Sequence, residues 1–158
     1  MKIGGHGLRE HLHLLAPLFA LIAAVWVLRM VLAALDAPHL VVHYCSVTLA
    51  GAFSILLAVM LIHLRSFGSY PNVAVAAFLL ECWQQGLISL AIVFSILSGI
   101  QTIYTTPPYA GTEGPRAHIL GHLTFGIGMG TIFGTAMGCL LLWLLRRMVP
   151  LGAGPQRR

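Results

Sequence analysis

Histidine is the side chain of this sequence with the clearest capacity for chemistry, because eight of the 158 residues are histidines. Two pairs have a spacing of four residues, His39 with His43 and His118 with His122. Residues four apart share one face of a helix, so two such imidazoles can bind one metal ion together. If both pairs lie at the same membrane face, four imidazoles from neighbouring helices would suit Zn²⁺ or copper.

Three interpretations of these histidine pairs remain open. In the first, the imidazoles lie at the membrane interface and bond headgroups, water and the amides at helix starts. In the second, they bind Zn²⁺ or copper, and a second shell of side chains orients the rings. That shell would come from four residues expected at the same face: Asp36, Glu113, Tyr104 and Tyr109. In the third, His43 or His122 is an axial ligand of a haem b, and nearby glycines admit the ring.

Glu81 is a carboxylate in the middle of an apolar stretch, and Gln85 and Ser89 follow it at spacings of four. At about 1.5 Å per residue, Glu81 falls near the bilayer midplane, where a charge costs at least about 2.5 kcal/mol. We expect this polar stripe to face the bundle interior or a neighbouring subunit. Glu81 should be neutral, paired or hydrated, and a proton-carrying or substrate-binding role is open. Arg29 is expected either to reach the headgroups or to pair with Glu81.

Composition indicates that all these residues belong to a membrane protein. The chain is 58% hydrophobic and 8% charged, with a mean hydropathy of +0.90, whereas soluble domains are about 25% charged. Four apolar stretches, residues 12–35, 40–64, 73–100 and 119–145, reach the roughly 20 residues that span a bilayer. The sequence therefore predicts an all-α, four-helix transmembrane bundle with a glycine-rich fourth helix. It forms a single domain over residues 1–148, followed by a short basic tail, 149–158.

The lysines and arginines flank these stretches and predict the orientation. If both termini are inside, the inner side holds seven of them: Lys2, Arg9, Arg65, Arg146, Arg147, Arg157 and Arg158. The outer side then holds at most two, Arg29 and Arg116. This bias predicts an N-in, C-in protein of the bacterial inner membrane with both termini cytoplasmic. The net charge of +5 reflects these flanking positions, so we expect no nucleic-acid partner.

Three further histidines, His11, His13 and His63, are expected at the same inner face. Basic side chains there lie beside anionic lipid headgroups. We therefore expect these histidines to anchor the chain at the interface.

Small residues at spacings of four predict how the helices pack. Close packing and hydrogen bonds hold helices together in lipid, and small side chains permit close approach. The fourth stretch carries Gly126, Gly130, Gly134 and Gly138, and the second carries Ser46, Ala50, Ser54 and Ala58. We expect these two helices to form the tightest contact of the bundle.

The sequence indicates the function of the protein less clearly than its fold. Known phosphate-binding, nucleophile-elbow and metalloprotease motifs are absent from the sequence, so we do not expect an enzyme. The chain is interpreted first as a small subunit of a larger membrane assembly, with a redox or electron-transfer assembly as one form. A small oligomeric transporter that uses Glu81 is the second interpretation, and a non-catalytic scaffold is the third. The expected partners are the lipid bilayer and other membrane subunits or further copies of the chain.

Overall fold

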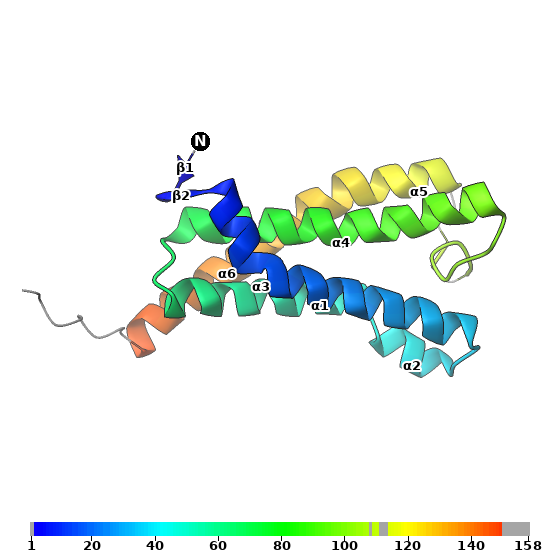
Figure 1. The fold of residues 1–158 in the computed structure, drawn as a ribbon, viewed down its shortest axis with the longest axis horizontal. Coiled ribbons are helices and arrows are strands. Elements are labelled where there is room, and N and C mark those ends of the chain that lie inside the picture. Colours follow the sequence, from blue (N-terminus) through cyan, green and yellow to red (C-terminus); the bar gives the residue numbers. More distant parts are fainter. Residues whose placement is uncertain (1, 108, 111–113, 150–158) are drawn as a thin grey trace, which may run out of the picture.

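The computed structural model describes residues 2–107, 109–110 and 114–149. Helices make up most of this length, and a small hairpin precedes them (Figure 1). In chain order the elements are β1 (Lys2–Ile3), β2 (His6–Gly7), α1 (Leu8–Ala34), α2 (His39–Tyr44), α3 (Val47–Leu64), α4 (Tyr70–Ser98), α5 (Pro115–Gly121), the π-helical turn η1 (His122–Gly126) and α6 (Ile127–Met148).

Four helical segments are long and apolar enough to cross a membrane, as the sequence predicted. They are Leu8–Ala34, His39–Leu64, Tyr70–Ser98 and Pro115–Met148. The second is broken between α2 and α3, and the fourth contains η1. The tail predicted for residues 149–158 lies outside the described residues, apart from Val149.

Local chemistry accounts for the helix ends. The backbone N–H of Gly7 donates to the Glu10 carboxylate at 2.6 Å, which caps the start of α1. Pro71 lies in the first turn of α4, where a missing N–H costs nothing. Gly99 ends α4 with φ of 71°, a left-handed conformation that suits glycine.

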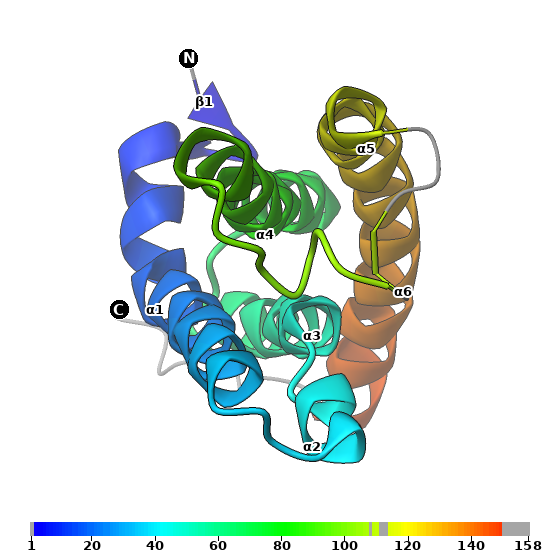
Figure 2. The same ribbon diagram turned by 90° about the vertical axis from the view of Figure 1, so that its right-hand side faces the viewer.

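The long helices run between two ends of an elongated bundle (Figure 1). We call the end that holds the β1–β2 hairpin, the α3–α4 turn and the last turn of α6 the terminal end. The opposite end, the loop end, holds α2, the start of α5, and residues 99–107 and 109–110, which we call the 99–110 segment. Figure 2 views the loop end, where the segment that follows α4 crosses the bundle. Both ends of the described chain lie at the terminal end, as an even number of spans requires.

Helices α3 and α4 are central to the bundle, since each packs against the other and against both α1 and α6. The most extensive contact of α6 is with α4 and not with α3, so the prediction that the second and fourth spans pack most closely is wrong. The glycine stripe explains the difference. Gly126 and Gly130 face side chains of α4, while Gly138 lies between Val73 of α4 and Val59 of α3.

The small residues predicted to pack on the second span differ in burial along its length. Ser54 and Ala58 are fully buried, whereas Ser46 and Ala50 are only partly buried. The buried part of this row lies in α3, which packs against α1, α4 and α6. The prediction of a close-packed seam therefore applies to the middle of the span and not to its start.

Leu142 tests how much apolar packing contributes to the bundle. Its side chain is fully buried in the apolar core, whereas Leu140, two residues earlier, is 51% exposed. Leu142→Ala is expected to lower the free energy of unfolding by about 2–5 kcal/mol, because the cavity removes packing contacts. Leu140→Ala should cost far less. Circular dichroism during denaturation in detergent measures both, and equal losses would contradict this assignment of the core.

Candidate functional site

The polar stripe of α4 lies inside the protein. Glu81 is 7% exposed, and Gln85 and Ser89 are as well buried. The Gln85 side-chain amide donates to Glu81 Oε2 at 3.3 Å. Glycines on α6 make room for both side chains, because a Cβ at Gly130 would overlap the Glu81 carboxyl and one at Gly126 would contact the Gln85 amide.

The same glutamine connects the stripe to the second histidine pair. Gln85 Oε1 lies 2.7 Å from Nδ1 of His122, which belongs to the π-helical turn. The Nε2 atoms of His122 and His118 are 3.0 Å apart. A hydrogen-bonded chain of four side chains, Glu81, Gln85, His122 and His118, therefore runs from the interior of α4 to α5 at the loop end. We call it the polar chain.

One arrangement of protons satisfies every link of the polar chain. Because the amide group of Gln85 donates to Glu81, its oxygen must accept, and His122 Nδ1 must carry a proton. Neutral His122 then has a lone pair on Nε2 that accepts from His118. All donors point towards Glu81, and hydrogen bonds aligned in this way strengthen one another.

A cavity of about 400 Å³ lies beside the polar chain. Gln85, His118 and His122 line it, together with Thr48 of α3 and Phe125 of η1. The helix changes from α to π geometry at His122 itself, and such turns are frequent at functional sites. The Thr124 hydroxyl also donates to the Leu120 carbonyl at 2.6 Å within this segment.

The first histidine pair lies apart from the polar chain. His39 and His43 are on α2, with ring centroids 6.0 Å apart, and His43 Nδ1 is 3.2 Å from the Tyr109 hydroxyl. Figure 2 shows α2 and α5 at separate places around the loop end. Within residues 2–107, 109–110 and 114–149, no three His, Cys, Asp or Glu side chains are grouped to hold a metal ion. The expected four-imidazole site is therefore not formed by the described residues.

Of the side chains predicted to orient those rings, Tyr109 alone has a described contact with a histidine of either pair. Tyr104 is buried against Arg29, and Asp36 lines a separate cavity beside Thr102 and Thr106. Glu113 lies outside the described residues.

Arg29 does not form the predicted pair with Glu81. Its side chain is 5% exposed, because it is covered by other residues of the protein. Its guanidinium lies over the rings of Tyr104 and Tyr109, 5.2 and 4.8 Å from their centroids. Such cation–π contacts compensate part of the cost of burying the charge. Arg29 thereby holds the 99–110 segment against α1.

The environment of Tyr104 is consistent with this role for Arg29. Burial raises the pKa of the Tyr104 phenol, and the positive charge of Arg29 opposes that rise. The phenol therefore stays protonated and neutral over Arg29 at physiological pH.

The residues present do not fit a haem lying against the glycine stripe. Gly126 and Gly130 are covered by Gln85 and Glu81, and a Cβ at Gly134 would lie 2.7 Å from Ile55 Cδ1. The face that a porphyrin would need is thus filled by side chains of α4 and α3.

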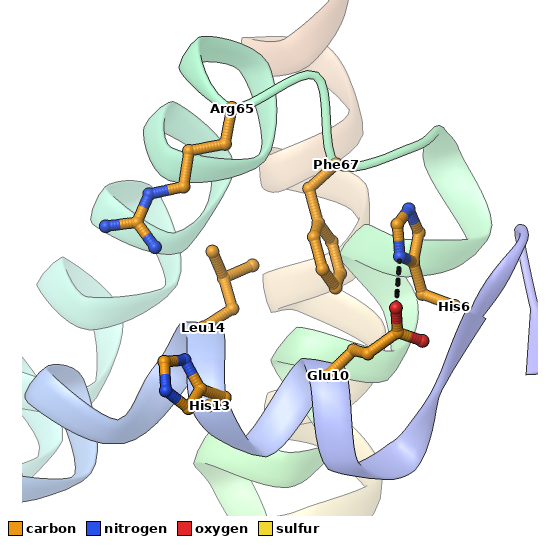
Figure 3. Close-up of a pocket in the computed structure, with 6 residues that line it drawn as sticks. All are labelled: His6, Glu10, His13, Leu14, Arg65 and Phe67. Atoms are coloured by element: carbon orange, nitrogen blue, oxygen red, sulfur yellow. Dashed lines mark hydrogen bonds and ion pairs between the residues drawn. The ribbon is translucent and has the colours of Figure 1, made fainter.

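A second group of titratable side chains lines a cavity of about 340 Å³ at the terminal end (Figure 3). Structural roles account for Glu10 and His6. Glu10 caps α1 and lies 3.5 Å from His6, whose ring stacks on Phe67 at 3.8 Å between centroids. His13 and Arg65 line the cavity without joining that contact (Figure 3).

The histidines predicted to anchor this end in headgroups are not all at the surface. His11 is buried between the Gly7 carbonyl and the Asn72 side chain, at 2.9 and 3.0 Å. His63 is buried and lies 3.0 Å from the Val149 carbonyl. These two rings hold the hairpin and the end of α6 in place, and only His13 is exposed as predicted.

The sequence pattern predicts the members of the polar chain as two separate groups, the polar stripe of the third span and the histidine pair of the fourth. The signal that joins the two groups is the stripe of the fourth span, in which His118 and His122 continue the positions of Gly126 and Gly130. Once those glycines pack against α4, the histidines must face it too. Searches for a matching family model, a similar curated protein and a similar solved structure found none.

Proposed function

We propose that this chain is a small membrane transporter that moves protons through the bilayer by way of Glu81. The observation that carries the proposal is the polar chain, which joins a buried carboxylate to a cavity at the loop end. Ionisable groups inside a bilayer are costly, and they commonly mark ion pathways and proton relays. A structural role alone would be met more cheaply by apolar side chains.

Glu81 is the group that takes up and releases the proton in this proposal. Its carboxyl lies against a glycine of α6 and accepts from Gln85, so both a protonated and an ionised form have a partner. Gln85 does not carry protons itself, because an amide neither gains nor loses one readily. It orients the carboxyl and the imidazole, and the neighbouring cavity gives it room to swing aside.

The polar chain reaches only part of the way across the bundle. Beyond Glu81, towards the terminal end, the core consists of apolar side chains such as Val73, Ala77 and Leu80. A proton on Glu81 therefore needs a movement of α6 against α4 to leave on that side.

The proposal keeps the predicted orientation in the inner membrane, with both termini cytoplasmic. Its support is the charge at the terminal end, where Lys2, Arg9, Arg65, Arg146 and Arg147 all lie. The loop end and the cavity then face the outside. Protons would enter from that side.

The interpretation of the chain as a subunit of a larger assembly, or as an oligomer, stays a prediction. One observation favours it: only 11% of the most apolar window of the fourth span is buried, against 56% for the third. A helix so little covered has most of its surface available to lipid or to another subunit. Native mass spectrometry of nanodisc-embedded protein would count the copies.

Proton flux in liposomes tests the proposal. The purified chain is reconstituted with a pH-sensitive dye inside the vesicles, and a potassium gradient with valinomycin makes the interior negative. The wild-type protein is expected to acidify the interior faster than protein-free vesicles do. Glu81→Gln should return the rate to that of protein-free vesicles, because the amide cannot carry the proton.

Glu10→Gln is the matched control, since Glu10 is an exposed carboxylate at the terminal end and glutamine can still accept the Gly7 N–H. Its flux should equal that of the wild type. Circular dichroism of Glu81→Gln establishes that the fold is retained. Wild-type vesicles no faster than empty ones, or full flux in Glu81→Gln, would contradict the proposal.

A further inference from the structure

The two histidines at the outer end of the polar chain have the geometry of a metal-binding pair. Their Nε2 atoms are 3.0 Å apart, with ring centroids separated by 4.8 Å. Two nitrogens bound to a tetrahedral Zn²⁺ at about 2.0–2.1 Å are about 3.3 Å apart. The rings therefore need to separate by only a few tenths of an ångström for an ion to replace the hydrogen bond between them.

The tautomer of His122 suits a metal ligand. Its Nδ1–H donates to Gln85 Oε1 at 2.7 Å, which leaves the lone pair of the neutral ring on Nε2, facing His118. Metal-binding histidines almost always donate their second ring N–H to an oxygen in this way. The amide of Gln85 is in turn held by the Glu81 carboxyl at 3.3 Å, so the ligand His122 is oriented by two further side chains.

Space for an ion exists next to the two rings. The cavity of about 400 Å³ is lined by both histidines, and both are partly exposed. Two imidazoles fill half of a tetrahedral shell, and water molecules in the cavity can complete it. Imidazole nitrogens select Zn²⁺, Cu²⁺ or Ni²⁺ over Mg²⁺ or Ca²⁺, which prefer oxygen ligands.

We propose that His118 and His122 bind a divalent transition-metal ion in the cavity at the loop end. The ion ligates both Nε2 atoms and breaks the hydrogen bond between them, and the proton that His118 carried on Nε2 moves through water to its Nδ1. The binding depends on the geometry of the pair and not on transport. Its consequence rests on the proposed function: an ion on both rings closes the outer end of the polar chain and blocks proton flux.

The other histidine pair of the chain offers a matched control. His39 and His43 have the same spacing of four, but their rings are stacked with centroids 6.0 Å apart, and His43 is held by Tyr109. Spacing alone predicts equal binding by both pairs. The structure predicts binding by His118 and His122 only.

The experiment is equilibrium dialysis of Zn²⁺ against the full-length chain in nanodiscs, with any histidine tag removed and zinc counted by elemental analysis. The wild type is expected to hold about one zinc per chain. His118→Ala and His122→Ala should each lose it, whereas the double variant His39→Ala/His43→Ala should keep it. Gln85→Leu should weaken binding about tenfold or more, as loss of a second-shell partner does.

Three results would overturn the metal site: no zinc on the wild type, full zinc on His118→Ala, or an equal loss in the His39/His43 control. Circular dichroism of each variant distinguishes loss of ligands from loss of fold. Glu81→Gln is expected to keep its zinc while its proton flux is lost, so failure of the metal site and failure of the transport proposal are separately visible.

Discussion

Replacing Gly138 with leucine is expected to separate α6 from the bundle and to lower the free energy of unfolding by about 3 kcal/mol or more. A Cβ at this position would lie 2.7 Å from Cγ1 of Val73 and 3.0 Å from Cγ2 of Val59. Both valines are β-branched and have few rotamers available, and they belong to α4 and α3. Three helices must therefore move apart. Unfolding in detergent, followed by circular dichroism, measures the loss.

Gly128→Leu is the control for this prediction. Gly128 lies on the same helix, and no described atom is within 4 Å of its Cβ position. We expect Gly128→Leu to lose no stability and to gain up to about 1 kcal/mol, because leucine forms helices better than glycine does. If both variants lost the same stability, the loss would come from adding a leucine to α6 at any position and not from the contacts of Gly138. The close approach of α6 to α3 and α4 would then not be what holds the bundle.

Gln85→Leu is expected to reduce proton flux by at least about tenfold, although glutamine does not titrate. The substitution removes the donor to Glu81 Oε2 and the acceptor of His122 Nδ1. Each of these two hydrogen bonds contributes about 0.5–1.5 kcal/mol, and about 1.4 kcal/mol corresponds to a tenfold change in rate. Leucine is similar in size, so the helix packing is retained. The liposome assay measures the rate.

The neighbouring glutamine serves as the comparison. Gln84 is also buried on α4, but it lies against Gly51, and its Oε1 has no hydrogen-bond partner among the described residues. Gln84→Leu should leave the flux unchanged. An equal loss in Gln84→Leu and Gln85→Leu would mean that buried polarity in general, and not the polar chain, supports the flux.

The number and approximate limits of the four apolar helices could be predicted from the hydropathy pattern of the sequence. Each apolar stretch is long enough to cross a bilayer, and glycine, proline or charge lies near each border. The break between α2 and α3 could not be predicted from this pattern, because Cys45 and Ser46 lie within a continuous apolar run. Hydropathy does not distinguish a broken helix from a straight one.

The residues of the candidate site could be predicted from the sequence, but the hydrogen bonds that join them across α4 and η1 could not. Glu81, Gln85 and Ser89 do lie on one buried face of α4. Their partner depends on how α6 is rotated, and the pattern of one helix does not contain the rotation of the next. Arg29 illustrates the same limit, because its contacts are tyrosines of the 99–110 segment, whose path over the loop end follows no periodicity.

The hydrogen bond between Gln85 and His122 is the link on which the account depends, because it joins the buried carboxylate to the histidine pair. A double-mutant cycle of proton flux tests it, with Gln85→Leu, His122→Phe and the variant that carries both. If the two residues belong to one path, the double variant should be no slower than the slower single variant. If the two reductions multiply instead, the residues act independently, and the polar chain is not the route that protons take.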